Sequence, residues 1–240
     1  MTEVNGGADD AMTAIRSGLE SQMIVHDEKV VFQGDDESQF TVFQTDVSVD
    51  GESGDGEGEG EGAGDGAPRT HSVLFAQVRG GQPSAVCIPV RSDGRLLLVR
   101  HWRIATDSFE WEFPRSMGVP GEVSGATAER ELFAEAGVGT DGRRLLQMIH
   151  ADTCKLRDSV AVVEAKVSDE EIQAGAEAAA DGAQGAQPVR AVDDPFRADV
   201  DDTDSRLAWL TPEEIDTMIV EGNIMDGITL AAYLIWKIRR

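Results

Sequence analysis

The sequence is poor in lysine, in cysteine and in long apolar runs, and each shortage narrows the class of protein. Four of its 21 basic residues are lysines, against 45 acids, and the formal net charge is −24. Such a chain repels phosphate backbones and anionic lipid surfaces, so we expect no nucleic-acid partner and no membrane partner. No run approaches the roughly 18 to 20 apolar residues of a membrane span. The first residues have neither the basic start nor the apolar core of a secretory signal.

The two cysteines, Cys87 and Cys154, do not form a CxxC pair. Free thiols in a reducing compartment are the expectation, although two cysteines also leave room for one disulfide. At 240 residues and 40% apolar composition, the chain is long enough to bury a core in one or two domains. We therefore expect a cytoplasmic protein.

The acidic residues are gathered in three stretches. Residues 1–37, 50–66 and 169–204 carry formal charges of −7, −7 and −9, while the other 150 residues hold 18 acids and 17 bases. The 50–66 stretch is almost entirely glycine and acid, so it cannot bury apolar surface and should be solvated. The composition therefore describes a nearly neutral folded body that carries acidic insertions.

Strand-like segments lie between these insertions. Ser84–Val90 is a nearly continuous apolar run, which is typical of a strand buried on both faces. The 50–66 stretch falls between two expected strands, and we interpret it as an enlarged hairpin connection. The other expected strands are Lys29–Gln33, Gln39–Val49, His71–Val78, Arg95–Arg100, Leu145–Ile149, Ser159–Val167 and Arg206–Leu210.

Three helices are expected. Ala126–Ala136 is rich in helix formers, with Ser124 as its cap and Gly137 as its stop. The TPEE sequence at Thr211 is typical of a helix start, and a further helix follows Asp226. The apolar part of this last helix is too short to cross a bilayer, so it should pack on a core. Strands and helices are mixed along the chain, which predicts an α+β fold with a mixed sheet.

The first helix carries carboxylates on one face. Glu131 and Glu135 are four residues apart, and Glu122, where a Gly/Pro-rich loop meets the helix, can join them. Carboxylates that converge repel each other unless cations lie between them, and oxygen ligands of this kind suit Mg²⁺ or Mn²⁺. An ordinary amphipathic helix with a solvated glutamate face has the same periodicity. Periodicity alone therefore does not distinguish a metal site from such a face.

The spacing of these residues is more specific than the helix pattern. It resembles the Nudix box, which reads Gly, five residues, Glu, seven residues, Arg-Glu, aliphatic, any residue, Glu-Glu, any residue, Gly, aliphatic. Two positions depart, because Ser116 stands at the first Gly and Ala134 at the first Glu of the pair. The positions that agree are Glu122, Arg130, Glu131, Leu132, Glu135, Gly137 and Val138.

Segments outside the box resemble the ADP-ribose pyrophosphatase-like Nudix enzymes. The RLLLVRHWR segment and Trp111–Pro114 look like the strands before the box, and residues 207–234 look like the last strand and two helices. The strands before residue 79 look like the small antiparallel sheet of that subgroup, often a dimer element. The resemblance thus implies an α/β/α sandwich with a mixed sheet, a small amino-terminal antiparallel sheet and a homodimer.

The same resemblance implies a division of the chain. Residues 1–20 would be a flexible tail. Residues 21–79 would be the amino-terminal sheet element with its acidic insert at 50–66. Residues 80–240 would be the Nudix hydrolase domain, with an acidic low-complexity loop at 169–204.

The resemblance implies hydrolysis of the pyrophosphate in a nucleoside diphosphate derivative, such as ADP-ribose or a nucleotide sugar. Glu131 and Glu135 would bind Mg²⁺ or Mn²⁺, with the backbone carbonyl of Arg115 as a further ligand. Glu122 would join through water or act as a structural partner. Arg103 matches a position that contacts the substrate phosphate in this subgroup.

The general base implied by the resemblance is an acid on the loop before the last strand. Asp201, Asp202 and Asp204 all qualify, and Asp202 is our choice. The departures at Ser116 and Ala134 leave a second hypothesis open, a catalytically impaired Nudix module that binds a nucleotide ligand or a protein partner. Serine restricts a backbone position that glycine leaves free, and Ala134 removes one metal ligand.

Overall fold

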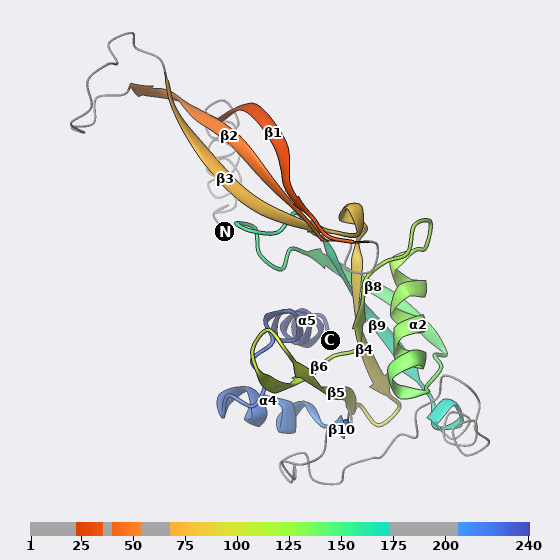
Figure 1. The fold of residues 1–240 in the computed structure, drawn as a ribbon. Coiled ribbons are helices and arrows are strands. Elements are labelled where there is room, and N and C mark those ends of the chain that lie inside the picture. Colours follow the sequence, from red (N-terminus) through yellow and green to blue (C-terminus); the bar gives the residue numbers. More distant parts are fainter. Residues whose placement is uncertain (1–22, 36–39, 54–67, 173–205) are drawn as a thin grey trace, which may run out of the picture. The chain divides into compact units, whose positions relative to one another are not determined.

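The computed structural model describes residues 23–35, 40–53, 68–172 and 206–240. These residues form two compact units that divide between Gly80 and Gly81, with Cys154–Arg157 belonging to the first unit. Figure 1 shows the elements of each unit along the chain.

The first unit is a three-stranded antiparallel sheet. Its strands are β1 (Met23–Gln33), β2 (Phe40–Ser53) and β3 (Pro68–Val78), in the spatial order β1-β2-β3. The acidic insert at 50–66 therefore joins two adjacent antiparallel strands, and its residues 54–66 lie outside the described ranges. The Cys154–Arg157 segment adds to this sheet through two backbone hydrogen bonds with Ala76, each 2.8 Å long.

One arginine ties this small sheet together. The rings of Phe43 and Phe75 stack with centroids 5.4 Å apart, and the Arg157 guanidinium lies 4.2 Å from the Phe75 centroid. Arg157 also forms an ion pair with Glu28 on β1, which lowers the pKa of that carboxyl. The stacked rings and the ion pair therefore fix this segment against all three strands.

The second unit is built on a mixed seven-stranded sheet. Its central order is β10-β5-β4-β9-β8, with β6 paired to β5 and β7 paired to β4. β4 and β9 run parallel in this sheet, and the other pairs are antiparallel. The strands are β4 (Ser84–Arg91), β5 (Leu96–Arg103), β6 (Ser108–Glu112), β7 (Arg115–Ser116), β8 (Gly142–Ile149), β9 (Val160–Val167) and β10 (Arg206–Leu210).

Helices cover both faces of this sheet. α2 (Ser124–Ala136) packs on one face, and α4 (Pro212–Val220) and α5 (Gly227–Ile238) pack on the other (Figure 1). Alternate residues of β4 point to the two cores, so Ala85 belongs to the α2 core and Val86 to the α4/α5 core. The continuous apolar run of β4 is thus buried on both faces. The expected α+β fold with an α/β/α sandwich and a small antiparallel sheet is confirmed.

The helix ends follow the sequence signals with one exception. Gly137 ends α2 in the left-handed region (φ 65°), and Thr211 makes a complete capping box with Glu214. The expected Ser124 cap of α2 is wrong. The capping position is Val123, whose carbonyl accepts the first helical hydrogen bonds from Ala126 and Thr127, and no side chain caps it. The helix therefore begins one residue earlier than the serine signal indicates.

The last helix is hydrogen-bonded to the short link between β6 and β7. Thr229, in the first turn of α5, is 1% exposed, and its Oγ1 accepts a hydrogen bond of 3.1 Å from the Phe113 backbone N–H. Phe113 is itself 1% exposed.

No helix of the described ranges is long and apolar enough to cross a membrane. Cys87 and Cys154 are free thiols, the first buried and the second exposed.

We expect Thr229→Val to lower the free energy of unfolding by about 1–3 kcal/mol, because it leaves the buried Phe113 N–H without an acceptor. Urea denaturation measures this loss. Thr217→Val is the matched control, since Thr217 is exposed on α4 and its hydroxyl bonds a backbone carbonyl of the same helix. Equal losses in the two variants would contradict this role of Thr229.

Candidate active site

The carboxylates of Glu131 and Glu135 lie one turn apart on α2. The opposite face of the helix, with Ala128, Leu132 and Ala136, is buried against the sheet and fixes its rotation. Both carboxylates are largely withdrawn from solvent, with side chains 16% and 17% exposed. Burial, reinforced by the neighbouring Glu135 charge, raises the pKa of Glu131, and a hydrogen bond from the Ser116 hydroxyl opposes the shift.

This pair fits a divalent cation. Oε2 of Glu135 is buried and has no hydrogen-bond partner among the described residues. Burying an ionised oxygen without a partner is costly, and a cation between the two carboxylates would remove that cost. Within the described ranges, no three His, Cys, Asp or Glu side chains are grouped to hold a metal. The two carboxylates therefore need further donors to complete the shell around a cation.

The serine that replaces the first box glycine is not strained. Ser116 lies in β7 opposite Ala85 on β4, and its φ is not in the left-handed region. The close approach in this loop falls at Gly118 instead, where an added Cβ would stand 2.2 Å from the Pro83 carbonyl oxygen. Serine at 116 thus keeps the backbone path and adds a hydroxyl that bonds Glu131.

Arg130 links the first box glutamate to the pair. Glu122 accepts hydrogen bonds from Arg130 Nη2 at 3.1 Å and from the Thr127 hydroxyl at 2.8 Å, and both lower its pKa. Nη1 of Arg130 lies 3.6 Å from Oε2 of Glu131. The structure therefore brings Glu122 to the site through Arg130, which bridges it to Glu131.

The sequence profile of the NUDIX domain matches residues 81–224, more than half of the chain. The chain belongs to the NUDIX domain family. A solved structure described as an ADP compounds hydrolase superposes with a TM-score of 0.58 at 15% sequence identity, over 90% of this chain and 92% of that one. At this identity the likeness shows the shared fold alone. None of the curated proteins matches the sequence significantly.

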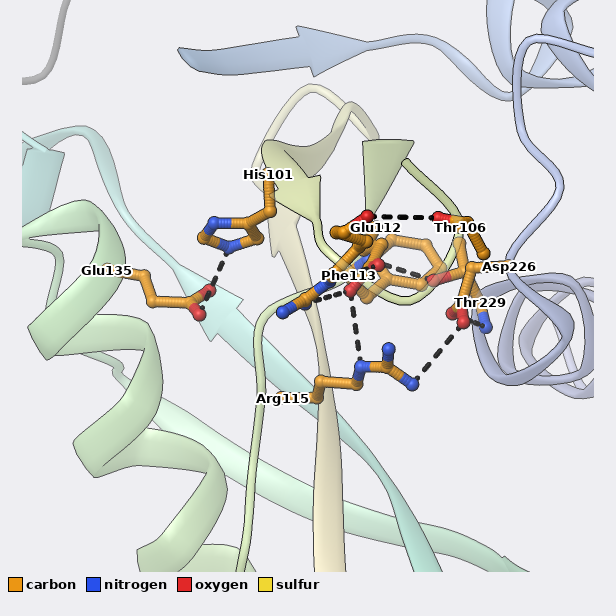
Figure 2. A network of polar contacts seen from close by, with 9 residues as sticks. His101, Thr106, Glu112, Phe113, Arg115, Glu135, Asp226 and Thr229 are labelled. Carbon is orange, nitrogen blue, oxygen red and sulfur yellow. Dashed lines mark hydrogen bonds and ion pairs between the residues drawn. The ribbon is translucent and has the colours of Figure 1, made fainter. Parts of the chain in front are cut away.

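Beside the Nudix box, a buried carboxylate organises two arginines (Figure 2). The Glu112 side chain is 2% exposed. Arg103 Nε donates to its Oε1 at 2.7 Å, and Arg103 Nη2 also pairs with its Oε2. Arg115 Nε lies 3.2 Å from Glu112 Oε2, while Arg115 Nη1 lies 3.3 Å from Asp226 Oδ1. Since Asp226 caps α5, the network ties this helix to the strands before the box.

The geometry leaves one edge of Arg103 outside this ion pair. A guanidinium has five N–H donors, and the bidentate contact with Glu112 uses the Nε and Nη2 side. The Arg103 side chain is 36% exposed, so part of it reaches solvent while Glu112 fixes its orientation. Arg103 is therefore oriented by a buried partner that no sequence pattern had paired with it.

A histidine of the site was not anticipated from the sequence. His101 extends from β5 toward α2, and its Nε2 lies 3.2 Å from Glu135 Oε1 (Figure 2). The four histidines of the chain have no ligand-like spacing, so the sequence alone gives no reason to place one of them at this site. Packing of α2 on the sheet creates this contact, so no local sequence signal could have indicated it.

A cavity of about 520 Å³ lies beside the start of α5. It is lined by Ile149, His150, Ala151, Asp226, Gly227, Ile228 and Ala231. Asp226 thus joins the cavity to the arginine network of the Nudix box. The candidate general base Asp202 lies outside the described residues.

Proposed function

We propose that this Nudix protein hydrolyses the pyrophosphate of a nucleoside diphosphate derivative, ADP-ribose or a nucleotide sugar, with Mg²⁺ or Mn²⁺. The observation that carries the proposal is the buried Glu131–Glu135 pair, with one carboxylate oxygen left without a partner. Membership of the NUDIX family supports a divalent-metal hydrolase, and the structural neighbour described as an ADP compounds hydrolase supports this substrate class.

The residues of the box have different roles in binding the cation. Glu131 and Glu135 would hold the cation, with the Arg115 carbonyl as a further ligand. Arg130 keeps Glu131 in place and is itself held by Glu122. When bound, the cation neutralises pyrophosphate charge and makes a bound water more acidic.

The substrate is positioned by groups outside the box. Arg103 turns its exposed edge to a phosphate oxygen, and its bidentate contact with Glu112 removes the entropic cost of ordering it. The cavity at the start of α5 has a size typical of ligand pockets, and Asp226 offers an acceptor to sugar hydroxyls there. We assign the general base to Asp202, as the subgroup pattern implies.

A substrate panel tests the proposal. Purified full chain is incubated with ADP-ribose, nucleotide sugars, dinucleoside polyphosphates and oxidised dNTPs, each with Mg²⁺, Mn²⁺ or EDTA. We expect ADP-ribose to yield AMP in a metal-dependent reaction. No turnover of any substrate, together with a ligand-induced rise in Tm, would instead favour a catalytically impaired binding module. The unstrained Ser116 leaves Ala134 as the main argument for that alternative.

We also propose that the amino-terminal sheet mediates a homodimer. Every residue of β1 is exposed, and several are apolar. Exposed apolar side chains gathered on one small sheet are typical of an interaction site. The exposed apolar residues of this sheet are Met23, Ile24, Val25, Val30, Val31, Phe32, Phe40, Val73 and Leu74.

We expect Phe32→Lys to shift the protein from dimer to monomer, because a charge in an apolar interface must be desolvated without a partner. Size-exclusion chromatography with light scattering measures the mass. Val220→Lys is the control, since Val220 at the end of α4 is 87% exposed. A monomeric wild-type protein, or a dimer in both variants, would reject this interface.

A further inference from the structure

We propose that His101 is a nitrogen ligand of the divalent ion at the Nudix box, and that it shifts the preference of the site from Mg²⁺ toward Mn²⁺ and Co²⁺. The proposal rests on the proposed function, because it adds a donor to the metal site described there. It assigns a metal-binding role to a β5 side chain outside the box sequence.

The distance between His101 and Glu135 fits two neighbouring ligands of one ion. Adjacent donors in an octahedral shell with metal–ligand distances of about 2.1 Å stand about 3 Å apart. Nε2 of His101 and Oε1 of Glu135 are 3.2 Å apart. An ion could therefore bridge this nitrogen and this oxygen with little movement of either side chain.

Both side chains are held by rigid elements. His101 lies in β5 opposite Glu110 of β6, in a strand that also pairs with β10. Glu135 lies in the last turn of α2, whose apolar face is buried on the same sheet. The imidazole and the carboxylate are only 20% and 17% exposed. These two side chains are thus held by tertiary packing rather than by a mobile loop.

The Nudix box of this chain lacks one carboxylate that the imidazole would replace as a metal ligand. Ala134 removes one carboxylate that the Nudix pattern would offer to the metal. His101 supplies a neutral nitrogen donor beside Glu135, so the site gains a ligand without regaining the lost negative charge. Mg²⁺ prefers oxygen donors, whereas imidazole binds first-row transition metals well. The exchange of a carboxylate for an imidazole therefore favours the transition metals.

Pulsed EPR of the Mn²⁺-loaded full-length protein tests this ligand directly, because a coordinated imidazole nitrogen modulates the electron-spin echo. The probe is Mn²⁺ alone, without substrate. We expect ¹⁴N modulation in the wild-type protein, its loss in His101→Gln, and its retention in His71→Gln, a control in the exposed part of β3. Titration calorimetry should show Co²⁺ binding weakened about 10- to 100-fold in His101→Gln, with a smaller change for Mg²⁺.

The outcomes separate this inference from the proposed function. Mn²⁺ that binds in a Glu135-dependent manner without ¹⁴N modulation would overturn the His101 ligand and leave the metal-dependent hydrolase standing. Modulation that persists in His101→Gln would also overturn it. Absence of any Mn²⁺ binding would overturn both. Modulation that disappears with His101 alone supports the assignment.

Discussion

Glu135→Gln should lower kcat/KM by at least about 10³-fold while the protein stays folded, because the substitution removes one of two charges that hold the cation. The glutamine side chain has nearly the same shape. In the wild-type protein this carboxylate is buried beside Glu131, and one of its oxygens has no partner among the described residues. Removing the charge relieves that repulsion, so in metal-free buffer Tm should stay equal or rise. Steady-state kinetics and thermal unfolding in EDTA measure the two effects.

The same helix provides the control. Glu129 also lies on α2, but its side chain is 40% exposed and pairs with Arg143. Glu129→Gln makes the same chemical change and should leave kcat/KM within about threefold of wild type, as expected for a surface substitution. Full activity in Glu135→Gln would reject the assignment of the metal site. A large loss of kcat/KM in both variants would mean that a disturbed α2 helix, and not the missing Glu135 carboxylate, lowers activity.

The parts of the molecule that could be predicted from the sequence are those governed by local patterns. The apolar run Ser84–Val90 became a strand buried on both faces, and the TPEE sequence at Thr211 became a capped helix. Side-chain spacing along one helix likewise placed Glu131 and Glu135 on the same face. Each of these features depends on residues within about one turn or one strand of each other.

The features that could not be predicted depend on packing between distant elements. His101 reaches Glu135 because β5 and α2 lie against each other, and Asp226 reaches Arg115 because the start of α5 lies beside β7. Ser124 carried a plausible cap signal, but the backbone turned one residue earlier. A serine in the first turn of a helix and a capping serine are nearly identical at the level of sequence.

Arg103 illustrates the difference between identifying a residue and explaining it. Its match to a phosphate-contacting position gave a candidate role, while nothing in the sequence indicated how its guanidinium would be held. The structure supplies a buried carboxylate, Glu112, that receives it in a bidentate contact. In the sequence, Glu112 is recognisable only as a residue of the segment that leads into the box. An arginine positioned in this way differs from an ordinary surface arginine, which must be ordered by its ligand.

Glu112→Gln should lower the free energy of unfolding by about 2–3 kcal/mol, below the roughly 3–5 kcal/mol of a fully buried pair because both guanidinium groups reach solvent. The substitution leaves Arg103 and Arg115 facing a neutral amide, with Asp226 as the remaining carboxylate of the network. Urea denaturation at neutral pH measures the loss.

A second buried carboxylate on the same strand gives a matched comparison for Glu112→Gln. Glu110 is 5% exposed, and its Oε2 has no hydrogen-bond partner among the described residues, while Oε1 accepts a 2.6 Å hydrogen bond from Ser108. Glu110→Gln neutralises a buried charge that forms no ion pair with an arginine among the described residues. It should therefore lower the free energy of unfolding by under about 1 kcal/mol, or raise it. Similar losses in the two variants would mean that burial, and not the arginine network, sets the cost at Glu112. A large loss confined to Glu112→Gln would establish this carboxylate as the anchor of both arginines beside the Nudix box.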